Sequence, residues 1–156
     1  MPVPTQMFPV AGGALVPAAD QKLTGTIDAA GGLLSSSPTG YGIGYTTGSG
    51  GKVTQATNRT TGVTLNSLSG QITTNNASLA AEASANFTVT NSQVNLNDVV
   101  CAAIQSGTNG GNTAVTVVTV ADGSFVIKVS NNNASAGTAE TGAIIINFVV
   151  IKGAAA

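Results

Sequence analysis

Val115-Thr-Val-Val-Thr-Val-Ala-Asp-Gly-Ser-Phe-Val-Ile-Lys-Val-Ser130 is the stretch of this chain that decides the fold. Two runs rich in β-branched residues, Val115–Val120 and Phe125–Val129, flank the turn Ala121-Asp-Gly123. Glycine at such a turn accepts the positive φ that a tight hairpin needs. In the second run apolar residues recur at every other position, as in a strand with one buried face: Phe125, Ile127 and Val129. The stretch predicts an antiparallel hairpin.

Six more strand-like runs lie outside the hairpin, so the chain has eight such runs at spacings near ten residues, separated by turn residues. The expected strands are Lys52–Thr57, Gly62–Asn66, Gly70–Thr74, Ala85–Asn91, Asp98–Gln105, Thr113–Val120, Ser124–Ser130 and Ala143–Ile151. Regular short strands separated by Gly, Asn and Ser indicate a sandwich or a barrel. We therefore predict an all-β fold, an antiparallel, jelly-roll-like β-sandwich of about eight strands that spans residues 51–156.

The core of this sandwich is expected to contain the larger apolar residues of these runs. They are Phe87, Val89, Val99, Ile104, Val115, Val117, Phe125, Ile127, Ile145 and Phe148. Because Ala143–Ile151 is almost continuously apolar, it is expected to be buried on both faces. Cys101 lies in another apolar run and is expected to be a small buried hydrophobe without a disulfide partner.

Residues 1–50 differ in composition and predict an extended arm with a glycine-rich hinge at its end. All five prolines lie here, and apolar residues occur singly or in pairs without a helix or strand period. The segment is nevertheless too apolar for a solvated disordered tail. We expect it to lie in the grooves of a partner surface through the following residues: Phe8, Leu15, Val16, Leu23, Ile27, Leu33 and Leu34.

Composition argues against an enzyme. The chain has no histidine, one cysteine, six acidic and five basic residues, and charged residues make up 7% of it. General acid–base chemistry near neutral pH needs histidine or clustered carboxylates and lysines, and here no two acids lie close in sequence. We predict no catalytic residues, although carboxylates distant in sequence could still meet in the fold.

Binding sites for cofactors, metals and polyanions are not expected either. One cysteine without histidine cannot make a zinc site, and only an incidental calcium at Asp98, Asp122 or Glu140 is conceivable. The glycines of Gly42–Gly48 lack the spacing and the basic residue of a phosphate loop. A net charge of −1 with scattered lysines favours neither nucleic acid nor an anionic membrane as partner. No export signal is evident, which predicts synthesis in a cytoplasm.

Several segments together resemble a widespread structural module of tailed bacteriophages. They are Gly42-Ile-Gly-Tyr-Thr-Thr-Gly-Ser-Gly-Gly-Lys-Val-Thr-Gln-Ala-Thr-Asn-Arg-Thr-Thr-Gly-Val-Thr-Leu-Asn66, Gly70-Gln-Ile-Thr-Thr74, Phe87-Thr-Val-Thr-Asn-Ser92, Asp98-Val-Val100 and Ile144-Ile-Ile-Asn-Phe-Val-Val-Ile-Lys152. The resemblance covers roughly residues 40–152 and leaves out the arm. Such modules are β-sandwich domains of capsid decoration (cement) proteins, head fibres and tail-associated fibres, and they are often trimeric.

The resemblance implies a non-enzymatic virion protein, made in the host cytoplasm and located on the outer capsid surface. It would decorate the head and stabilise it, with the major capsid protein and copies of itself, as a homotrimer, for partners. The alternative is a receptor- or glycan-binding module of a head or tail fibre or spike. Surface aromatic residues and acids clustered in a groove would favour this alternative or a depolymerase, whereas a hydrophobic arm ordered on the shell would favour decoration.

Overall fold

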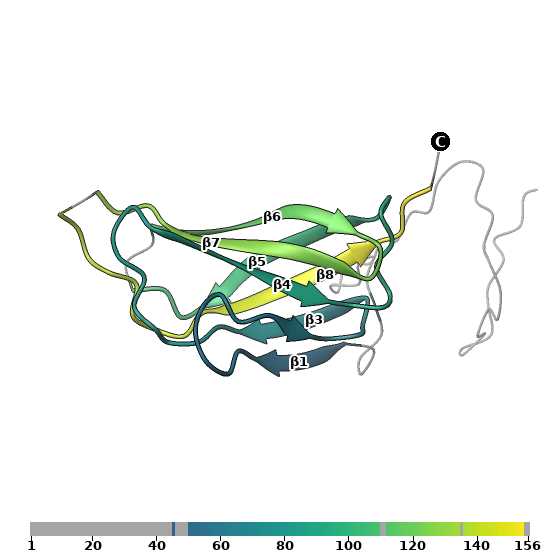
Figure 1. Ribbon diagram of the computed structural model, residues 1–156, viewed down its shortest axis with the longest axis horizontal. Coiled ribbons are helices and arrows are strands. Elements are labelled where there is room, and N and C mark those ends of the chain that lie inside the picture. Colours follow the sequence, from purple (N-terminus) through teal and green to yellow (C-terminus); the bar gives the residue numbers. More distant parts are fainter. Residues whose placement is uncertain (1–44, 46–49, 110–111, 135, 155–156) are drawn as a thin grey trace, which may run out of the picture. The chain divides into compact units, whose positions relative to one another are not determined.

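The computed structural model describes Tyr45 and residues 50–109, 112–134 and 136–154 of the chain. Within those residues every regular element is a strand (Figure 1). The strands are β1 (Gly51–Thr54), β2 (Val63–Thr64), β3 (Ser69–Thr73), β4 (Ser84–Thr90), β5 (Val99–Ser106), β6 (Thr113–Ala121), β7 (Ser124–Asn131) and β8 (Ile145–Ile151). Each strand falls on a run expected from the sequence, so the all-β prediction is confirmed.

Two four-stranded sheets build the sandwich. Sheet A has the strand order β1-β3-β8-β5, and sheet B has the order β2-β4-β7-β6. The sandwich is confirmed, but its sheets are mixed instead of purely antiparallel, because β1 pairs with β3 and β2 pairs with β4 in parallel. The first four strands alternate between the sheets along the chain. Each of these pairs is therefore joined by a crossover, the connection that parallel pairing requires.

The expected hairpin is formed by β6 and β7, which meet at a two-residue turn. Gly123 has a φ of 77°, a value that favours glycine, and Ala121 pairs with Ser124 across the turn. Residues of β7 alternate between buried and half-buried along its whole length. The register between β6 and β7 shifts between Val117 and Thr119. This bulge leaves Val118 48% exposed on the edge strand β6.

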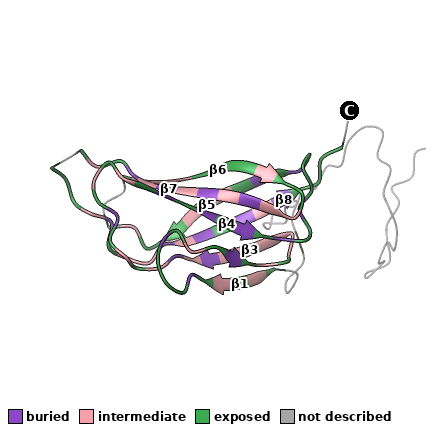
Figure 2. Ribbon diagram, viewed as in Figure 1, coloured by how far each residue is buried: buried purple, intermediate pink, exposed green. Residues whose placement is uncertain are grey.

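Buried residues recur along the strands of both sheets (Figure 2), and they form one hydrophobic core. The rings of Phe125 from sheet B and Phe148 from sheet A meet there, with centroids 5.2 Å apart. Each buried large apolar side chain contributes about 1.5–3 kcal/mol to folding. Five expected core residues are buried: Phe87, Val89, Phe125, Ile127 and Phe148. Three more are half-buried and pack against the core: Ile104, Val115 and Val117.

Two expected core positions are wrong by one residue. Val99 is 54% exposed while its neighbour Val100 is buried, and Ile145 is half-buried while Ile144 and Ile146 are fully buried. A strand turns successive side chains to opposite faces. When two adjacent residues are both apolar, the sequence pattern does not indicate which of them faces the core. The last strand is accordingly buried on one face, and its other face reaches the surface.

The chain divides into two units, Met1–Gly42 and Ile43–Ala156, and the sandwich belongs to the second. The seven apolar residues expected to make partner contacts in the arm lie outside the residues that the structure describes.

Candidate functional site

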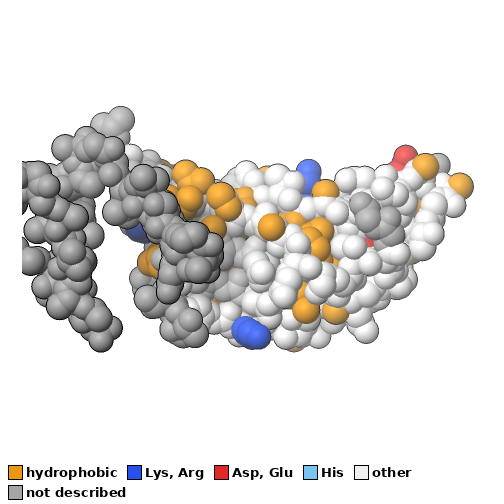
Figure 3. Space-filling model, turned by 180° about the vertical axis from the view of Figure 1, so that it is seen from behind, with side chains coloured by type: hydrophobic (Ala, Val, Ile, Leu, Met, Phe, Trp, Pro, Cys, Tyr) orange, Lys and Arg blue, Asp and Glu red, His pale blue; other side chains and the backbone are white. Residues whose placement is uncertain are grey.

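The outer face of sheet A carries an apolar strip along β5 and β8. Three cross-strand pairs form this outer strip: Val99 with Ile151, Cys101 with Val149, and Ala103 with Asn147. Val99 and Ile151 are 54% and 55% exposed, so they face water and not the core. Figure 3 shows apolar side chains gathered on one face of the molecule among mostly uncharged ones. Such a gathering of exposed apolar side chains marks a contact surface.

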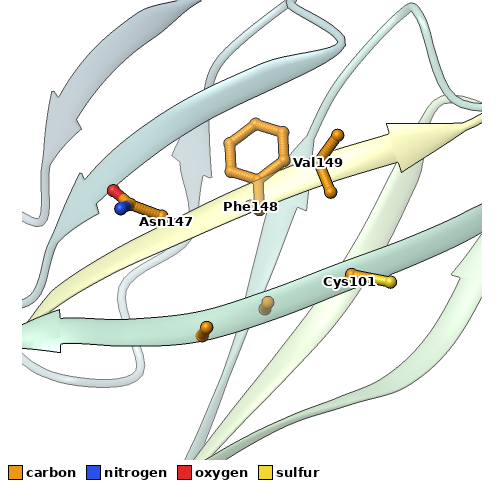
Figure 4. A pocket seen from close by; sticks show the side chains of 6 residues that line it. Cys101, Asn147, Phe148 and Val149 are labelled. Atoms are coloured by element: carbon orange, nitrogen blue, oxygen red, sulfur yellow. The ribbon is translucent and has the colours of Figure 1, made fainter. Parts of the chain in front are cut away.

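The strip includes a shallow hollow of about 220 Å³ between the two strands (Figure 4). Its lining combines Cys101, Ala102 and Ala103 on β5 with Asn147, Phe148 and Val149 on β8. The hollow exists because β5 carries small residues where β8 carries larger ones. No acidic or basic side chain lines it, so it suits an inserted apolar side chain and not acid–base chemistry.

Cys101 is exposed on this face, and the expectation that it is buried is wrong. The alternation of β5 turns Val100 and Ala102 toward the core, so Cys101 must face outward. Among the lining residues none could act as the base that a nucleophilic thiol requires. The thiol is therefore a surface group of the strip and a convenient chemical probe for it.

Two glutamine side chains border the strip on sheet A, next to Asn147, which is the strip's one amide. The Gln71 amide donates hydrogen bonds to the side-chain oxygens of Gln105 and Asn147. These residues lie on β3, β5 and β8, so the amides link the outer face across three strands. They also provide the signal that sequence reasoning missed. Gln105 and Asn147 mark the outward positions of β5 and β8, and counting in twos from them reaches Cys101 and Val149.

A buried carboxylate closes the sandwich beside the strip, where β5 begins and β8 ends. The Asp98 carboxylate accepts hydrogen bonds from Lys152 Nζ (2.5 Å) and from the backbone N–H groups of Asn95 (2.8 Å) and Gly153 (3.0 Å). The bond from Lys152 and then those from backbone amides lower the pKa of Asp98 to about 2. The ion pair of Asp98 and Lys152, called the clasp below, thus links the start of β5 to the end of β8.

A second polar cluster joins loops through Arg59 and Glu140, which are both buried. Arg59 donates hydrogen bonds to the carbonyl oxygens of Ala77, Glu140 and Gly142 and to Thr74 Oγ1. The Glu140 carboxylate accepts hydrogen bonds from the backbone N–H of Asn109, whose nitrogen lies 3.1 Å from each carboxylate oxygen, and from the Thr113 hydroxyl. Burial lowers the pKa of Arg59, and Glu140 partly opposes this effect. Sequence reasoning assigned no role to Arg59.

The acids considered for calcium do not assemble into one site. Asp98 and Glu140 bond as described above, and the Asp122 carboxylate accepts a hydrogen bond from the Leu96 amide at 2.8 Å. Among the described residues no group of three potential metal ligands occurs, and no buried side-chain nitrogen or oxygen lacks a hydrogen-bond partner. The carboxylates of Asp98, Asp122 and Glu140 therefore serve the loops and strand ends of the sandwich.

Tyr45 lies in the segment interpreted as a hinge, and its hydroxyl donates a hydrogen bond to the Val150 carbonyl oxygen at 2.5 Å. The expected glycine hinge otherwise lies largely outside the described residues.

No helix in the described ranges is long and apolar enough to cross a membrane. Comparison with protein-family models, with curated proteins and with solved structures finds no match to this chain.

Proposed function

We propose that this chain is a non-enzymatic structural protein of a tailed-phage virion, which decorates the outer capsid surface and cements the head. The outer strip of β5 and β8 is the observation that carries this proposal. An apolar surface in a chain with few charges suits lasting contacts with neighbouring proteins, and it is costly to leave in water. The resemblance of residues 40–152 to phage sandwich modules supports the same proposal.

In this role the protein works by mass action. A protein that binds only the assembled shell stabilises the shell by its binding free energy. Contacts that are weak singly become strong when many copies sit side by side on one particle, because each bound copy raises the effective concentration of the next contact. The major capsid protein would be the main partner, and neither nucleic acid nor a membrane is needed.

The arm is the proposed attachment device to the capsid. Its apolar residues have no periodic pattern that could build a core of their own, so they would be buried against the shell. The resemblance suggests three copies in the free protein, and the copy number can be measured separately from capsid binding.

Deleting residues 1–40 tests attachment. The sandwich forms a unit that begins at Ile43, so the truncated chain should fold and show the same thermal unfolding transition as the intact chain. We expect the intact chain to co-sediment with purified capsids and the truncated chain to stay in the supernatant. If the truncated chain decorates capsids equally well, the arm is not the attachment device. If the intact chain ignores capsids but binds host-surface glycans, the protein is a fibre module.

A further inference from the structure

The described strands leave four sheet edges, and three of them are protected against pairing with another chain. β1 has four residues and carries Lys52, β2 has only two residues, and β6 contains the bulge at Val118. Short edge strands, lysines and bulges are common devices that prevent edge-to-edge association. β5 differs because it has eight residues, none of them charged or proline, and its only irregularity lies beyond Ile104.

The hydrogen bonds of β8 reveal which backbone groups of β5 point outward. Val150 donates its N–H to the Leu68 carbonyl oxygen, so the polar groups of Val150 turn toward β3. Val100 is the partner of Val150 in β5, and this pair therefore exchanges no hydrogen bonds. The N–H and C=O groups of Val100 must then point away from β8. By the alternation of a strand, those of Ala102 and Ile104 do so too, and no described residue bonds to them across this edge.

We propose that β5 pairs antiparallel with β5 of a second copy of this chain. A two-fold axis brings the residues next to it close to their own counterparts, and the lack of charge from Val99 to Ser106 avoids the repulsion that such symmetry would cause there. The pairing joins two sheets A into one, and the two outer strips meet across the axis. This inference rests on the proposed structural function, and it replaces the three copies that the resemblance suggests by a pair of copies.

The geometry permits few registers. Only outward-pointing residues can bond across an antiparallel edge, so Val100, Ala102 and Ile104 of one copy must pair with the same three of the other. Val100 then pairs with Ile104, and Ala102 pairs with its own counterpart, so the axis passes near Ala102. Edge pairing covers only the β5 border of each outer strip and leaves the face of the strip open, so the contact area is well under the ~800 Å² per partner of a standard interface. Main-chain bonds would thus contribute much of the affinity, and we expect a dissociation constant of roughly micromolar order.

Amide hydrogen exchange of the intact chain, measured by NMR at about 10 μM and about 1 mM, tests the pairing. We expect exchange at Val100, Ala102 and Ile104 to slow severalfold, by up to about tenfold, at the higher concentration, because pairing protects these amides and the unpaired fraction falls at most with the square root of the concentration. Val99, Cys101 and Ala103 point toward β8, so their protection should be the same at both concentrations and serves as the internal control.

Fast exchange of the three outward amides at both concentrations would overturn the proposal. Equal protection at both concentrations would also overturn it, because the edge would then be covered from within one chain. A species of three copies with an unprotected β5 edge would favour the trimer suggested by the resemblance instead. None of these results depends on capsid binding, so failure of the edge pairing is distinguishable from failure of the proposed decoration function.

Discussion

The outer faces of the two sheets are built on the same alternation but carry different side chains. On sheet B, the outward positions of β4 are all exposed and polar: Ser84, Asn86, Thr88 and Thr90. On sheet A, the outward positions of β5 and β8 form the apolar outer strip, with Val99 and Ile151 more than half exposed. Hydroxyl and amide groups hydrate the outward side of β4 without charge, whereas the outward sides of β5 and β8 lack that protection.

This difference assigns separate tasks to the two faces. A strand with polar outward residues gains little from contact, because each hydrogen bond to water must be replaced. The outer strip loses little on leaving water, since only Asn147 among its six residues is polar. Association is therefore expected through sheet A, with sheet B facing solvent.

The largest expected effect is on the free energy of unfolding, which should respond differently to substitutions on the inner and outer faces of β8. Ile146 is fully buried and Ile151 is 55% exposed, although both lie on β8. Ile146→Ala should lower the free energy of unfolding by about 2–5 kcal/mol through the cavity it creates. Ile151→Ala should cost less than about 1 kcal/mol. Urea unfolding of the two variants measures this, and equal losses would mean that the outer strip is part of the core.

Substitutions at Arg59 should lower the stability of the fold without changing how copies of the chain associate. Arg59→Met would leave the carbonyl oxygens of Ala77 and Gly142 without their donor and should cost about 2–3 kcal/mol. Arg59→Lys should recover only part of this loss, because an ammonium cannot reproduce the guanidinium fork. Neither variant should change the oligomeric state at a temperature where both are folded. A change of mass at that temperature would link the loop cluster to association.

The smallest effect concerns pH and the clasp at Asp98. Its pKa is lowered from 3.8 to about 2 in the folded protein, so folding favours the ionised form. The stability that this pair contributes is complete above about pH 4 and is lost as the pH falls toward 2. Asp98→Asn should remove this part of the pH dependence, which urea unfolding at several acidic pH values would show. Identical acid profiles for both proteins would contradict the shift.

The strands were predictable because their periodicity is local. β7 alternates apolar and other residues around a turn with glycine, and nothing distant is needed to recognise it. The parallel pairing of β1 with β3 was not predictable, since strand order depends on crossovers that no local pattern records. The inward face of β5 was missed for another reason: Val99 and Val100 are alike in size and polarity, and only packing selects between them.

The sequence indicated that the sandwich has an apolar outer surface, but it did not indicate which residues form that surface. Adjacent hydrophobes such as Ile144, Ile145 and Ile146 indicated that more than one face of the sandwich is apolar. Their assignment to faces needed the register between β5 and β8. The bonds of Arg59 to Thr74 and Glu140 join positions up to 81 residues apart, and such contacts leave no trace in spacing.

The central claim is that this protein associates through the β5 side of sheet A, and sedimentation equilibrium of a matched pair of lysine variants tests it most directly. Ala103→Lys puts a charge on the outer strip, and Val118→Lys puts one on the exposed part of β6. Both should change the free energy of unfolding by less than about 0.5 kcal/mol. At concentrations where the unaltered protein is dimeric, we predict that Ala103→Lys is monomeric and that Val118→Lys remains dimeric. Equal association of the two variants, or loss of association in Val118→Lys alone, would contradict the account.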